Sequence, residues 1–136
     1  MNMAKFHNAV QQYNKVGVAA GVEEASPHRL IQMLMEGVIE KISTAKGHME
    51  RGETAKKGSH ISWAISIVDG LRASLDMSLG GEVAQNLDDL YDYINRRLVT
   101  ANLENDTDLL DEVSSLLKSI KSAWDELPEA DKSNKI

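Results

Sequence analysis

The sequence predicts an all-α protein: an antiparallel, up-down-up-down four-helix bundle with a semi-ordered N-terminal arm. Three observations favour this fold. Apolar residues recur at three- and four-residue steps through four consecutive segments. The connections between these segments are short, which places successive helices antiparallel. A chain of 136 residues can also bury about two-thirds of its unfolded surface, enough for one core.

The first segment, 1–25, differs from the rest of the chain. Its apolar residues are separated by polar ones, and Gly17 and Gly21 interrupt any long helical spacing. We interpret this segment as a semi-ordered arm, and the simpler alternative is a frayed terminus.

The first helix is predicted over 26–51. Pro27 occupies its first position, where the missing N–H costs nothing. Its apolar stripe consists of Leu30, Leu34, Gly37, Val38, Ile42, Ala45 and Met49.

The second helix is predicted over 54–79, with Thr54 as its cap and Gly80-Gly81 as its end. Its apolar stripe consists of Ile61, Ile65, Val68, Leu71 and Leu75. The third helix is predicted over 82–104, and its spacing is equally regular. The apolar stripe of this third helix consists of Val83, Leu87, Leu90, Ile94, Leu98 and Ala101.

The fourth helix is predicted over 106–127, with Asn105 or Asp106 as its cap. Pro128 ends it, because proline cannot continue a helix, and 128–136 is expected to be a frayed tail. The apolar stripe of the fourth helix consists of Leu109, Leu110, Val113, Leu116, Leu117, Ile120 and Trp124.

The apolar stripes differ in width. At 100° per residue the fourth helix has a stripe of about 140°, which is ordinary for a bundle. Trp63 and Ile67 widen the apolar or small arc of the second helix to about 200°, and Met33, Met35 and Ile39 widen that of the first. Either the arm or an uneven core covers this excess, or it forms an exposed groove for an apolar partner. The pattern leaves both interpretations open.

Composition and missing motifs exclude several function classes. The chain has no cysteine, so it has no disulfide, thiol nucleophile or cysteine metal site. It also lacks the Glu-x-x-His pairs of di-iron bundles and the glycine-rich phosphate loops. Its formal net charge of -6 argues against non-specific binding to nucleic acid or anionic membrane. We therefore expect no catalytic residue, cofactor or metal.

The chain also lacks the features of exported and membrane-inserted proteins. The first residues, 1–13, show no basic-then-apolar signal pattern, and no apolar run approaches the roughly 18 residues of a membrane span. We therefore expect a cytoplasmic protein with no membrane insertion.

Over nearly its whole length the sequence resembles a known family, the flagellin export chaperones named FliS. The order and spacing of many short stretches carry the resemblance together, and no single stretch is decisive. These stretches are Val10–Tyr13, Ala25–Leu34, Glu36–Gly37, Arg51–Glu53, Lys57–Gly58, Gly70–Asp76, Gly80–Glu82, Asn86–Tyr93, Arg96–Leu98, Ala101–Asn102, Asn105–Asp106 and Ala123–Trp124.

The resemblance implies a cytoplasmic helical bundle without catalytic activity. Such a protein binds the disordered C-terminal segment of newly made flagellin, which becomes helical as it wraps the chaperone. Binding blocks premature polymerisation and delivers flagellin to the export gate of the flagellar type III secretion apparatus. The family is also linked to the anti-sigma factor of flagellar gene control. Tyr13 matches the tyrosine of the family's arm, and Val10 matches the apolar residue three positions earlier.

In this family the arm can cover the partner-binding surface when that surface is empty. We therefore hypothesise that the arm folds over a face formed by Trp63 and Ile67 and that flagellin displaces it. Met35 and Trp63 depart from the family pattern. The partner-binding candidates are Val10, Tyr13, Met33, Met35, Ile39, Trp63 and Ile67. The main rival is a self-associating helical adaptor or scaffold that does not bind flagellin, and a metal-binding bundle is a weaker third possibility.

Overall fold

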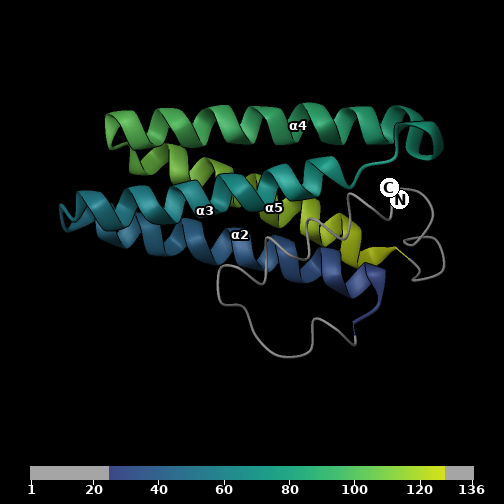
Figure 1. The fold of residues 1–136 in the computed structure, drawn as a ribbon, viewed down its shortest axis with the longest axis horizontal. Helices are drawn as coiled ribbons and strands as arrows, with labels where there is room; N and C mark the ends of the chain where they lie inside the picture. Colours follow the sequence, from purple (N-terminus) through teal and green to yellow (C-terminus); the bar gives the residue numbers. More distant parts are fainter. Residues whose placement is uncertain (1–24, 128–136) are drawn as a thin grey trace.

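A computed structural model describes residues 25–127, which form four consecutive α-helices (Figure 1). Their bounds are Pro27–Glu50 for α2, Thr54–Ala73 for α3, Met77–Glu104 for α4 and Thr107–Glu126 for α5. No strand occurs between residues 25 and 127. The prediction of an all-α four-helix bundle is confirmed. The predicted tail and nearly all of the predicted arm lie outside the described residues.

Hydrogen bonds between helices show their relative directions. Gln32, near the start of α2, donates to Asp125 near the end of α5, with 2.6 Å between Nε2 and Oδ1. Lys46, near the end of α2, donates to Asp111 near the start of α5. These two contacts make α2 and α5 antiparallel. Figure 1 shows the chain reversing at each connection, and α2 and α4 each pack between α3 and α5.

The ends of α2 follow from local chemistry. The Ser26 side chain accepts a hydrogen bond from a backbone N–H of the first turn, and Pro27 begins the helix as predicted. At the other end Gly52 has a φ of 71°, which glycine adopts without steric cost. The backbone N–H of Glu53 then donates to the His48 carbonyl at 2.9 Å. This contact is that of a Schellman motif, which satisfies carbonyls left free at a helix end.

The boundary between α3 and α4 differs from the prediction. The helix expected to continue to residue 79 ends at Ala73 instead. The Asp76 carboxylate accepts hydrogen bonds from the N–H groups of Ser78 and Leu79, and this cap starts a new helix before the glycine pair. The break expected at the glycines is a kink within α4, where Gly81 has φ 53° and ψ −127°.

Two other caps refine the sequence-based picture. Thr54 is the first residue of α3 rather than its cap, and Glu53 precedes it without a side-chain capping bond, so that prediction was wrong. Asn105 and Asp106 were alternatives for one cap and serve two helices. Asn105 ends α4 in the left-handed conformation, and the Asp106 carboxylate accepts from two N–H groups at the start of α5.

The core is a single cluster to which all four helices contribute. Most of its largest fully buried side chains are aliphatic and belong to the four predicted stripes, whereas Ile67 was predicted beside the stripe of the second helix. The largest aliphatic ones are Leu34, Ile42, Ile61, Ile67, Leu71, Ile94, Leu98, Leu110 and Leu117.

Candidate partner-binding groove

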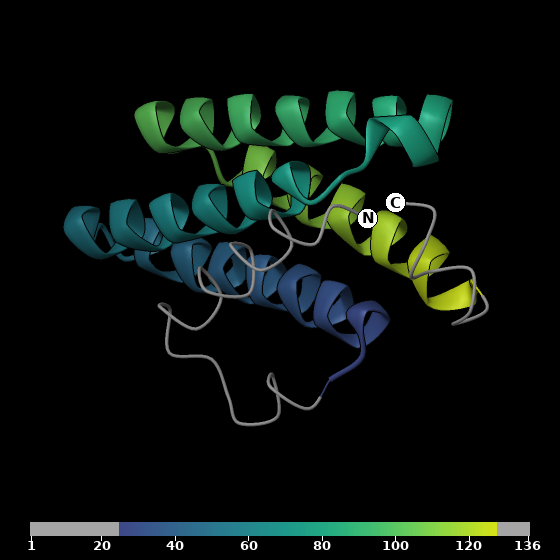
Figure 2. The same ribbon diagram turned by 45° about the vertical axis from the view of Figure 1, so that its right-hand side comes forward.

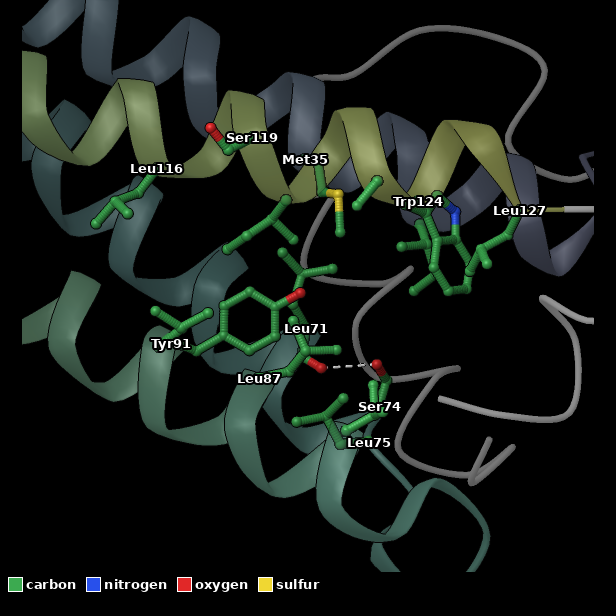
Figure 3. A pocket seen from close by; sticks show the side chains of 15 residues that line it. Met35, Leu71, Ser74, Leu75, Leu87, Tyr91, Leu116, Ser119, Trp124 and Leu127 are labelled. Carbon is green, nitrogen blue, oxygen red and sulfur yellow. Dashed lines mark hydrogen bonds between the residues drawn. The ribbon is translucent and has the colours of Figure 1, made fainter.

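An apolar groove opens on one side of the bundle, between the C-terminal end of α3, the N-terminal half of α4 and the C-terminal half of α5. Its volume is about 480 Å³. Figure 3 shows side chains of these helices converging on this hollow. The residues that line the apolar groove are Ile31, Met35, Leu71, Ser74, Leu75, Val83, Leu87, Leu90, Tyr91, Leu116, Ser119, Ile120, Ala123, Trp124 and Leu127.

The groove exists because the apolar stripe of α4 is only half covered. In the C-terminal half of α4, Ile94 and Leu98 are fully buried in the core. In the N-terminal half the same stripe continues, yet Val83 is 58% exposed and Leu90 is 37% exposed. Figure 2 shows α4 and α5 near one another at the start of α5 and diverging toward its C-terminal end. Because of this divergence, none of the helices between residues 25 and 127 covers the first half of the stripe.

Ion pairs and a hydrogen bond attach α4 to α3 beside the groove. The Arg72 guanidinium of α3 donates to Asp88 at 2.5 Å and to Asp92 at 3.2 Å, both on α4. The hydrogen bond to Asp88 raises the pKa of Arg72, so this link stays charged at any physiological pH. One helical turn further on, the Asn95 amide donates to Asp69 of α3 at 2.8 Å. These contacts attach α4 to α3 between Asp88 and Asn95.

The polar atoms in the floor of the groove are directed into the protein. The Trp124 indole N–H donates to the His28 carbonyl at 3.1 Å. The Ser74 hydroxyl donates to the Leu71 carbonyl at 2.7 Å (Figure 3). Tyr91 is 2% exposed, and burial raises the pKa of its phenol, so the ring stays neutral. No lining residue carries a charge at neutral pH, so the groove suits an apolar ligand surface.

The predicted face shared by Trp63 and Ile67 is not present. Ile67 is fully buried in the core, because α3 packs against both α2 and α4. Trp63 is 40% exposed and lies away from the groove. The Lys41 ammonium lies 4.6 Å from its ring centroid, and the His60 ring meets it edge-on at 5.4 Å. The core therefore takes in Ile67 from the wide arc of α3 and leaves Trp63 partly exposed.

The other predicted contact residues are dispersed. Met33 and Met35 are buried, and Met35 also forms part of the groove floor. Ile39 lines a separate, more polar hollow between α2 and α5. Val10 and Tyr13 lie outside the described residues, so their predicted contact with a partner stays a prediction. Of the seven candidates, the structure brings Met35 to the groove.

Sequence reasoning missed most of the groove because it assigned whole stripes to the core. One signal was available on the last helix. Its apolar residues form two rows rather than one, and the second row, offset by about 70° at 100° per residue, is less buried and supplies three of the residues that line the groove. The core row is Leu110, Val113, Leu117 and Trp124, and the outer row is Leu109, Leu116, Ile120 and Leu127.

Between residues 25 and 127, no three His, Asp or Glu side chains converge closely enough to hold a metal ion. Over that range, none of the helices combines the length and the apolar character that crossing a membrane requires.

Comparison with known proteins agrees with the resemblance. The family model described as "Flagellar protein FliS" matches residues 9–131. The chain is 54% identical over 117 residues to the flagellar secretion chaperone FliSB of Pseudomonas aeruginosa, covering 86% of this chain and 93% of the relative. It is 44% identical over 121 residues to the flagellar secretion chaperone FliS of Salmonella typhimurium, covering 88% and 90%. The chain therefore belongs to the FliS family of flagellar proteins, which are chaperones and not enzymes.

Proposed function

We propose that this protein is a flagellar export chaperone acting in the cytoplasm. It binds the disordered C-terminal segment of flagellin, prevents premature polymerisation and delivers the subunit to the flagellar type III export gate. Family membership and the printed names of the relatives support the general role. The uncovered apolar groove between α4 and α5 is the observation that carries the more specific claim.

The groove has the dimensions for one face of a helical segment. Its α5 wall runs from Leu116 to Leu127, which spans about 16 Å at 1.5 Å per residue. A segment of two to three helical turns, with apolar residues at i, i+3 or i+4 and i+7, matches about this length. A segment that folds on binding loses about 2–5 kcal/mol in ordering. Burial of apolar surface, at about 25 cal/mol per Å², offsets that loss.

Calorimetric titration with a peptide of the flagellin C-terminus tests the proposal. We expect saturable binding of one peptide per chain, a negative heat-capacity change from apolar burial, and a gain in helical circular dichroism. A folded, monodisperse sample that takes up no peptide would reject flagellin binding. If that sample instead dimerised with rising concentration, the self-associating adaptor would become the better account.

Two matched valine substitutions on α4 locate the binding surface. Val83→Glu places a carboxylate on the groove wall at a residue that is 58% exposed. Val99→Glu makes the same change at a residue that is 48% exposed, about 160° around the helix. Burying a carboxylate against apolar surface is costly, so Val83→Glu should weaken peptide binding by at least about tenfold. Val99→Glu should leave the affinity unchanged, and equal effects would place the binding surface elsewhere.

A further inference from the structure

The groove ends at a polar contact between its two walls. Within residues 25–127, two side-chain hydrogen bonds cross from α4 to α5, and both end on the Glu112 carboxylate. The Tyr93 hydroxyl donates to Oε2 at 2.7 Å, and the Arg97 Nε–H donates to Oε1 at 3.1 Å. Tyr93 and Arg97 lie one turn apart on α4, so one carboxylate of α5 is held at two points. We call these three residues the Glu112 clip.

The clip stands at the inner end of the apolar groove. Leu90 precedes Tyr93 by about one turn on α4, and Leu116 follows Glu112 by about one turn on α5. Both leucines line the groove. On the other side of the clip, Leu98 of α4 is fully buried. The two helices therefore change from packed to diverging at the level of the clip.

The charges around the clip keep it formed at neutral pH. Hydrogen bonds from Tyr93 and Arg97 lower the pKa of Glu112, so its carboxylate stays ionised and accepts from both donors. The Arg97 guanidinium also lies 5.6 Å from the centroid of the Tyr93 ring. Glu112 and Arg97 are each more than one-third exposed, and exposed pairs contribute little to global stability. The main effect of the clip is therefore on geometry.

We propose that Glu112 is a positioning residue that sets the divergence of α4 from α5 and thereby holds the apolar groove open. Arg72 ties α4 to α3 but does not restrain it toward α5. The groove walls are apolar and solvated, so water favours their approach. Without the clip, the N-terminal half of α4 can lean toward α5 and cover part of the groove. A groove that is open beforehand lowers the free-energy cost of binding.

The first test measures groove width in the free protein. The native chain has no cysteine, so the substitutions Glu82→Cys on α4 and Ser122→Cys on α5 introduce two thiols that can each carry a spin label. We expect Glu112→Ala to shorten or broaden the distance distribution between the labels. The matched control is Asp111→Ala on the same helix. It removes an ion pair of α5 with α2, the 2.9 Å contact between Lys46 and Asp111.

The second test rests on the proposed function and measures affinity for the flagellin peptide. Removing hydrogen bonds to a charged group should weaken binding by about 3- to 10-fold in Glu112→Ala. Asp111→Ala should bind normally at a comparable thermal stability. Glu112→Gln keeps one acceptor oxygen and should fall between Glu112→Ala and the native protein. In a Tyr93→Phe/Arg97→Gln variant, adding Glu112→Ala should not lower the peptide affinity further, because both hydrogen-bond donors to Glu112 are already absent.

The two proposals fail in different ways. An unchanged label distance in Glu112→Ala would overturn the role of Glu112, even if the native protein binds peptide tightly. Equal losses of affinity in Glu112→Ala and Asp111→Ala would overturn it as well, because helix stability would then explain both. A changed distance in a protein that takes up no peptide would support Glu112 as the residue that sets groove width and would reject flagellin as the ligand.

Discussion

The side chain of Lys57 shows how one residue can join two helix ends. It lies at the start of α3 and is only 5% exposed. Its ammonium group donates to the Asn102 carbonyl at 2.9 Å and to the Asn105 side chain at 2.7 Å. These acceptors belong to the C-terminal end of α4, where free carbonyls carry partial negative charge. The helix end therefore takes the place of a carboxylate partner for a buried lysine.

Replacement of this lysine should destabilise the bundle. Lys57→Met keeps the apolar stem but leaves the Asn102 carbonyl and the Asn105 side chain without their donor, which should cost about 1–3 kcal/mol. Lys56→Met makes the same change at the neighbouring residue, whose side chain is 67% exposed. Its effect should stay within about 0.5 kcal/mol. Urea unfolding of both variants measures the difference, and a loss from Lys56→Met as large as that from Lys57→Met would contradict this account.

At the scale of the element, Gly81 determines the direction of the first turn of α4. Its φ of 53° and ψ of −127° are accessible to glycine and strained for other residues, and a Cβ there would meet nothing within 4 Å. Gly81→Ala should therefore lower the free energy of unfolding by about 1–3 kcal/mol through backbone strain alone. Gly58→Ala, within α3, should raise it by about 0.5–1 kcal/mol. Urea unfolding measures the change in unfolding free energy for each variant. A higher unfolding free energy for Gly81→Ala would contradict this account, because the backbone would then adopt another conformation at residue 81 without strain.

Helix ends are the part of the fold that local chemistry predicts well. Pro27 and Asp106 each act at a helix start as the sequence predicts, because such a position depends on residues within one turn of it. The end of α3 was missed for a reason of the same kind. The prediction used the glycine pair as the break and did not consider Asp76, which caps a helix that starts before the glycines.

The groove could not be predicted in this way, because helical periodicity gives the direction of a stripe but not what covers it. Val83 and Ile94 belong to one stripe of α4, and yet the first is 58% exposed and the second fully buried. The difference arises from the divergence of α4 and α5, which involves residues distant in sequence. The exposed face predicted on α3 was wrong at Ile67 for the opposite reason, because the neighbouring helices bury this side chain in the core.

At the scale of the whole molecule, uncovered apolar surface is concentrated on one helix. Most of the large apolar side chains that are exposed between residues 25 and 127 belong to α4: Met77, Leu79, Val83, Leu90, Val99 and Leu103. Polar contacts nevertheless fix α4 on both sides, through Arg72 of α3 and Glu112 of α5. This combination of a fixed position and an uncovered face allows the bundle to bind a partner without giving up its own core.

Stability of the whole bundle should fall on acidification, and two groups at one end of it contribute in separate pH ranges. Burial, followed by the nearby charges of Lys41 and His48, lowers the pKa of His60 below its ordinary 6.5. The unfolded chain then binds more protons than the folded one below pH 6.5, so stability is lost as the pH falls. Hydrogen bonds from Arg51 and His48 lower the pKa of Glu53 from 4.5 to about 2, and its contribution is lost between those values.

Urea unfolding from pH 8 to pH 2 measures both contributions, and single substitutions separate them. His60→Gln should flatten the profile of unfolding free energy just below pH 6.5 and leave the acid limb intact. Glu53→Gln should flatten the profile below about pH 4.5, where the Glu53 carboxylate titrates, and leave the loss just below pH 6.5 intact. The rings of His48 and His60 stack at 5.2 Å, so the two limbs originate at neighbouring side chains. A His60→Gln variant that kept the full loss below pH 6.5 would assign that loss to other groups.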